Sequence, residues 1–170
     1  MKHLIGDKSF YKRLIAIAVP IVVQQLITSS VQLVDNVMVG SLGELAIDSV
    51  SAVNQLYFIV ILVTFGTLGG AGVFTAQYFG SKDYGRLKET YRFKVLAALT
   101  IVTLSFFILT FFGGALFSLF TDNPTIIAGA EGYFKIVRWS MFPWAVSVSI
   151  SFTFRETGIT KPLLFISLGT

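Results

Sequence analysis

The sequence predicts an all-α integral membrane protein, and three observations lead to this class. First, 54% of the 170 residues are hydrophobic and only 13% are charged, which is about half the charged share of an ordinary soluble domain. Second, charged residues are absent from several long stretches of the chain. Third, the cationic residues gather in alternate connections between those stretches. Because so few charges cannot cover a water-facing surface, we expect much of the surface to face lipid.

Three uncharged runs are each long enough to cross a bilayer. They cover residues 14–34, 49–81 and 95–121, with lengths of 21, 33 and 27 residues. A hydrocarbon core about 30 Å thick needs about 20 helical residues, and backbone amides in lipid must be paired within the segment. We therefore predict a membrane-spanning helix at each run.

A fourth and a fifth run are shorter. Residues 139–154 are uncharged, and we extend this predicted span back to residue 132, which places Lys135 and Arg138 in the helix or at its interfacial end. The fifth run begins at Pro162 and stops at Thr170, nine residues later, so we expect it to be the truncated start of a further span. The predicted spans are, approximately, 14–39, 50–80, 95–120, 132–154 and 162–170.

The lysines and arginines predict the orientation of the chain. Eleven of the thirteen lie before the first span, between the second and third spans, or after the fourth span, and the other two connections hold none. The positive-inside rule then places the N-terminus in the cytoplasm of a multi-pass protein of the plasma (cytoplasmic) membrane. The basic cluster at 86–94 thus has a topological role, and we expect no nucleic-acid partner.

A polar stripe runs along the first span. Gln24, Thr28, Gln32 and Asp35 fall within an arc of about 80° on a helix. Such a stripe avoids lipid, so it faces either other helices or a water-filled cavity. In the first case the side chains hold helices together; in the second they line a functional site, and the stripe alone leaves both interpretations open.

Asp35 is the most informative member of the stripe. It lies about 31 Å along the helix from Leu14, where a carboxylate is either an ordinary solvated end charge or a group held inside the bundle. In the second case it can exchange a proton or ligate Na⁺. Pro20 removes one backbone hydrogen bond from the same helix and creates a point where it can bend. In the second span, Gly66 and Gly70 form a small-xxx-small pair that favours close helix packing.

Several kinds of chemistry find no support in the sequence. The chain has no cysteine, a single histidine at position 3, and no glycine-rich loop followed by a basic residue. These features argue against thiol chemistry, a histidine-ligated metal enzyme and an ATP-driven pump. We therefore expect neither an enzyme nor a structural metal or organic cofactor.

Five short segments, in their order and spacing, resemble the N-terminal lobe of multidrug and toxic compound extrusion (MATE) transporters. The segments are Pro20, Leu33-Val34-Asp35, Gly40-Ser41-Leu42-Gly43, residues 76–83 and residues 158–162. The resemblance implies a secondary active antiporter with two six-helix lobes, which exports organic cations and other amphiphiles in exchange for H⁺ or Na⁺. It also implies that Asp35 is the coupling-ion carboxylate and that the first helix bends at Pro20.

The sequence also departs from the family pattern. The cation site of the family draws on helices 5 and 6, whereas residues 1–170 reach only the start of helix 5. We therefore expect this chain to be part of a transporter whose partner is the C-terminal lobe of the same protein. Two alternatives are a lipid-linked oligosaccharide flippase of the same superfamily, which would need a strongly cationic cavity, and a non-transporting membrane assembly fragment.

Overall fold

The computed structural model describes residues 7–159, which are almost entirely helical and contain no strand. The helices are α1 (Lys8–Gly40), α2 (Glu44–Gly80), α3 (Tyr84–Phe117), α4 (Pro124–Val137) and α5 (Met141–Glu156), with a short 3₁₀ turn, η1 (Arg138–Ser140), between the last two. The predicted all-α class is therefore confirmed. The expected start of a further span at 162–170 lies outside the described residues.

Polar side chains begin three of the helices. The carboxylate of Asp7 accepts a hydrogen bond from the backbone amide of Lys8 at 2.7 Å, and that of Asp83 accepts one from the amide of Arg86 at 3.1 Å. Asn123 accepts one from the amide of Thr125 at 3.0 Å at the start of α4. Each cap satisfies a backbone donor that has no partner within its helix. Local sequence thus helps to fix where α1, α3 and α4 begin, whereas α2 begins after Gly43 without a side-chain cap.

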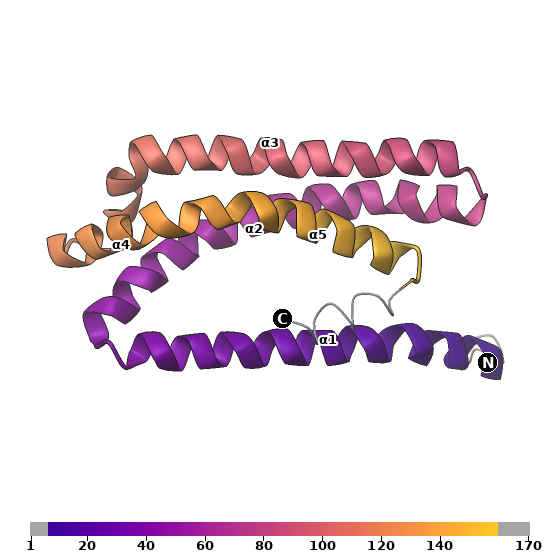
Figure 1. Ribbon diagram of the computed structural model, residues 1–170, viewed down its shortest axis with the longest axis horizontal. Helices are drawn as coiled ribbons and strands as arrows, with labels where there is room; N and C mark the ends of the chain where they lie inside the picture. Colours follow the sequence, from indigo (N-terminus) through magenta and orange to yellow (C-terminus); the bar gives the residue numbers. More distant parts are fainter. Residues whose placement is uncertain (1–6, 160–170) are drawn as a thin grey trace, which may run out of the picture.

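The helices form a bundle in which α2 is the central element (Figure 1). It contacts α3, α4 and α5, and it also contacts α1, which lies along the edge of the bundle. No described side chain of α1 is buried. The position of α1 relative to the other helices therefore depends on few contacts.

Three helices are long and apolar enough to cross a membrane, namely α1, α2 and α3. They contain most of the three longest uncharged runs of the sequence, and many of their large apolar side chains are exposed. A helix that exposes apolar side chains over most of its surface is stable when lipid surrounds it. The structure and the sequence thus agree on a membrane protein with several spans.

The fourth predicted span differs from the expectation of one helix over 132–154. The helical region begins at Pro124, and η1 divides it into α4 and α5, each shorter than a full span. Pro143, in the first turn of α5, cannot donate a backbone hydrogen bond to the carbonyl of Trp139. This missing bond explains why the helix changes to a tighter turn here.

Two clusters of buried apolar side chains hold the bundle together. One joins α2, α3 and α4, and the other joins α2, α3 and α5. The first contains Ala52, Val53, Leu56, Leu109, Phe117, Ala130 and Phe134. The second contains Val60, Leu68, Ala98, Val102, Met141 and Ala145. The core therefore lies along α2, and α1 contributes no buried residue to either cluster.

Candidate functional site

Asp35 borders a cavity of about 400 Å³ between α1, α2 and α4. Gln32 and Asn36 lie beside it on α1. Opposite them, α2 contributes Asn54 and Tyr57 and α4 contributes Tyr133. The apolar part of the wall is formed by Val39, Val50, Phe58 and Ile61. The cavity thus joins one carboxylate with three amide side chains and two phenols.

Tyr57 is a half-buried member of this cavity's lining. Its hydroxyl is buried and has no hydrogen-bond partner among the described residues. Its ring packs edge-on against Phe134, with centroids 6.4 Å apart, so the core of the bundle holds the phenol in position. Because a buried polar atom without a partner is costly, this hydroxyl keeps an unused capacity to bind a water molecule or another polar group.

The other members of the predicted stripe lie elsewhere on α1. Gln24 is half-buried, and its side-chain oxygen accepts a hydrogen bond from Arg155 of α5 at 3.1 Å. The hydroxyl of Thr28 donates to the backbone carbonyl of Gln24 at 3.0 Å. The structure therefore brings Gln32 and Asp35 together at the cavity, while Gln24 contacts another helix.

In the described part of the chain, the structure shows no bend at Pro20 that interrupts α1 and no close helix contact at Gly66 or Gly70. The helix α1 continues through Pro20 as one α-helical segment, and the bend stays a prediction. No described atom outside the local backbone lies within 4 Å of a Cβ built on Gly66 or Gly70. Both glycines line an exposed cavity of about 560 Å³ between α2 and α3, and their role in packing stays a prediction.

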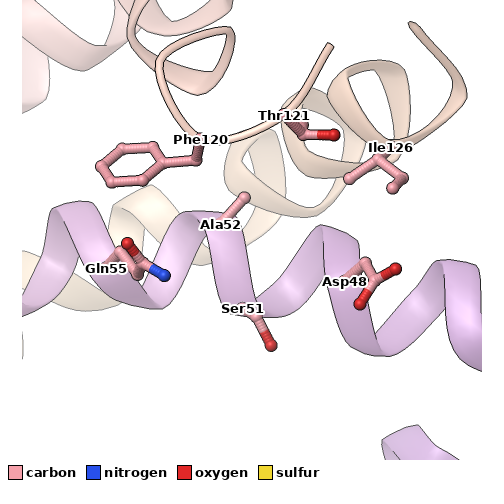
Figure 2. A pocket seen from close by; sticks show the side chains of 7 residues that line it. All are labelled: Asp48, Ser51, Ala52, Gln55, Phe120, Thr121 and Ile126. Atoms are coloured by element: carbon pink, nitrogen blue, oxygen red, sulfur yellow. The ribbon is translucent and has the colours of Figure 1, made fainter. Parts of the chain in front are cut away.

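A second cavity, of about 310 Å³, lies beside the first turns of α2 (Figure 2). Asp48, Ser51 and Gln55 of α2 line one side, and the segment that joins α3 to α4 lines the other with Phe120 and Thr121. The ring of Phe120 lies above Gln55 in this view. Asp35 does not border this second cavity. The polar lining of the second cavity is therefore separate from the surface around Asp35.

Charged residues of α4 and η1 lie against α3. Glu131 of α4 lies close to Gly114 of α3. A Cβ atom on Gly114 would be 2.7 Å from Oε1 of Glu131. Arg138 donates to the hydroxyl of Thr110 at 3.4 Å, and its guanidinium stands 5.3 Å from the ring centre of Phe106. The i,i+4 spacing of Glu131 and Lys135 allows an ion pair, but this pair does not form in the described structure.

Sequence reasoning missed several of the polar residues that the structure brings to these sites. Asn54 and Tyr57 are three residues apart in the second uncharged run, a spacing that could have marked a polar face. Their proximity to Asp35 was not readable, because it depends on how α1 and α2 cross. Within residues 7–159 no group of three or more His, Cys, Asp or Glu side chains is placed to hold a metal ion.

An all-helical chain with several long apolar helices is a multi-pass membrane protein. The profile of the MatE family matches residues 20–170, and the chain belongs to this family. Members of the family are transporters and not enzymes, which agrees with the expectation from the sequence.

Several curated proteins are similar to this chain. They include the probable multidrug resistance protein NorM of Bradyrhizobium diazoefficiens, which is 22% identical over 90% of the chain and 33% of its own length. The multidrug resistance protein MdtK of Pectobacterium atrosepticum is 26% identical over 76% of the chain and 28% of its own length. Protein DETOXIFICATION 8 of Arabidopsis thaliana is 26% identical over 93% of the chain and 33% of its own length. The chain therefore spans about a third of the length of these relatives. No solved structure matches it significantly.

Proposed function

We propose that the chain is part of the N-terminal lobe of a secondary active multidrug exporter, which exchanges organic cations or other amphiphiles for H⁺ or Na⁺. Two of the relatives are named for multidrug resistance, and the chain matches about a third of their length, which leaves room for a second lobe. In this proposal the N-terminus is cytoplasmic and the protein lies in the plasma membrane, as the distribution of Lys and Arg predicts.

In the proposed mechanism Asp35 is the coupling-ion carboxylate. The observation that carries this role is the cavity that Asp35 shares with Gln32, Asn54 and Tyr57. A carboxylate bordered by neutral oxygen and amide groups can bind a proton or a sodium ion, and each neutralises a charge that is costly near lipid. Neutralisation changes which hydrogen bonds the carboxyl group makes across the cavity. The relative stability of two positions of α1 against α2 and α4 would then depend on the bound ion.

The composition of the cavity favours the antiporter over the flippase alternative. A site for lipid-linked pyrophosphate requires cationic side chains, whereas the described lining of the Asp35 cavity has one carboxylate and no Lys or Arg. Apolar and aromatic walls of the kind provided by Phe58 and Ile61 suit amphiphilic substrates.

The direct test uses Asp35→Asn in the full-length protein, reconstituted into liposomes. We expect this variant to insert normally and to lose efflux driven by a proton or sodium gradient, with each gradient applied separately to identify the coupling ion. Glu44→Gln, which neutralises an exposed carboxylate at the start of α2, is the matched control and should keep efflux. Coupled efflux by Asp35→Asn at the wild-type rate would show that the proposed role of Asp35 is wrong.

A second series separates transport from a purely assembling role. Gln32→Leu and Thr28→Val change polar groups on α1 without changing charge. If these side chains only hold helices together, the variants lower stability; if they serve transport, they alter efflux at unchanged stability. Loss of stability with efflux intact would assign these side chains to helix assembly and not to transport.

A further inference from the structure

The last turn of α5 carries two neighbouring charged residues that reach different parts of the bundle. Glu156 accepts a hydrogen bond from the ammonium group of Lys94 on α3. Arg155 donates its Nη2 hydrogen to the side-chain oxygen of Gln24 on α1 at 3.1 Å. One turn of helix therefore connects α3 with α1, which are otherwise separated by α2 in the bundle (Figure 1).

The contact between Glu156 and Lys94 is a firm anchor. The side chain of Lys94 is fully buried and that of Glu156 is 16% exposed. Gly72 of α2 makes room for Glu156, because a Cβ atom at this position would overlap its carboxylate. Separating the pair would leave a buried charge without a partner, which is strongly unfavourable. The end of α5 is thus fixed to α2 and α3.

By contrast, α1 has little that holds it in place. Its half-buried residues include Pro20, Ile21, Gln24 and Ile27, which lie on one side of the helix at helical spacing. The others, Val39 and Gly40, lie at its end beside the turn to α2. The side of α1 that holds Gln24 is therefore its main contact with the bundle away from the turn.

The end of α5 meets α1 on both sides of Pro20. Arg155 bonds to Gln24, four residues after the proline. Gly158, which ends the helix with a positive φ of 72°, lies close to Ile17, three residues before the proline; a Cβ on Gly158 would be 3.8 Å from Ile17 Cδ1. Because proline cannot donate a backbone hydrogen bond, the segment between these contacts lacks one hydrogen bond of the helix.

We propose that Arg155 is a positioning residue that braces α1 across Pro20. The anchor of Glu156 and Lys94 keeps the end of α5 in place, and the bond from Arg155 then fixes the part of α1 that leads to Asp35. The bond to Gln24 joins a charge to a neutral amide, so it opens more easily than the buried ion pair. The consequence for transport rests on the proposed function of Asp35, whereas the brace itself does not.

The test measures distances in the full-length protein, purified in lipid nanodiscs. Spin labels are placed at Leu33 on α1 and Leu104 on α3, both of which are exposed, and residues 1–170 contain no cysteine that would react with the label. In Gln24→Leu, which removes the acceptor, we expect a longer α1–α3 distance to gain about tenfold to a hundredfold in population relative to wild type. Gln25→Leu removes an exposed amide from the next position and should leave the distances unchanged.

Three further variants make the test more specific. Arg155→Ala removes the donor and should shift the same distance, and its combination with Gln24→Leu should shift it no further than either change alone. Gln24→Glu retains the acceptor and should keep the short distance. A wild-type distribution in both Gln24→Leu and Arg155→Ala would overturn the proposal. The proposal would also be overturned if the distance between labels at Leu62 on α2 and Leu104 on α3 shifted as much as the α1–α3 distance, since this would show that the whole bundle had loosened.

The effect on transport is measured separately. In Gln24→Leu we expect the dependence of efflux on the coupling ion to shift, with activity retained at a saturating gradient. An unchanged ion dependence together with a shifted α1 would overturn the link between the brace and Asp35. If Asp35→Asn kept full efflux, the role of Asp35 would fail, and the brace would still be judged by the distances alone.

Discussion

Replacing Glu156 by glutamine should destabilise the protein more than any surface charge change does. The substitution leaves the ammonium group of Lys94 buried, with a side-chain exposure of 0%, and without its anionic partner. Breaking a buried ion pair from one side costs about 3–5 kcal/mol. We expect a decrease of this size in the free energy of unfolding, measured by denaturant titration of the full-length protein in detergent.

The controls follow from the same structure. Arg86→Gln removes an exposed ion pair with Asp83, whose two side chains are 67% and 43% exposed, and should cost at most about 1 kcal/mol. Adding Lys94→Met to Glu156→Gln should recover most of the loss, because no buried charge remains. If Glu156→Gln cost no more than Arg86→Gln, or if the double substitution were as unstable as the single one, the account of this pair would be refuted.

Three more predictions concern the packing of α4, each measured as the change in the free energy of unfolding. Phe134→Ala, which empties a site that is only 4% exposed, should cost about 3–5 kcal/mol, whereas Ile136→Ala, at a position that is 78% exposed, should change stability by less than about 0.5 kcal/mol. Gly129→Ala should cost about 1–3 kcal/mol, because its Cβ would lie 3.1 Å from the Cβ of Ser49 and still closer to the hydroxyl; adding Ser49→Ala should recover part of it. Asn123→Ala removes the cap of α4 and should cost about 0.5–2 kcal/mol; no change would show that the cap is dispensable.

Much of the fold could be predicted from the sequence because the constraint is local. An uncharged run of more than 20 residues has few stable conformations other than a helix across lipid, and α1, α2 and α3 each contain such a run. The division between α4 and α5 was not predicted, although Pro143 was a readable signal. Hydrophobicity shows which residues avoid water, but it does not show where a helix tightens into a 3₁₀ turn.

The candidate site was predictable only on α1. Gln32 and Asp35 stood out because polar side chains are rare in such runs, and both border the cavity. Their neighbours Asn54 and Tyr133 come from other helices. No sequence periodicity within one helix indicates which residues of another helix it will meet.

The sequence by itself determined that this chain belongs in a membrane, where its three long helices lie, and which residues of α1 are polar. Only the tertiary structure decided their partners: Gln24 meets Arg155, 131 positions away, and Lys94 meets Glu156, 62 positions away. The physical reason is that the hydrophobic and backbone requirements of a span act within one segment. Hydrogen bonds and ion pairs between helices depend instead on the packing of α2 against its neighbours, where Gly72 leaves the space that the carboxylate of Glu156 occupies.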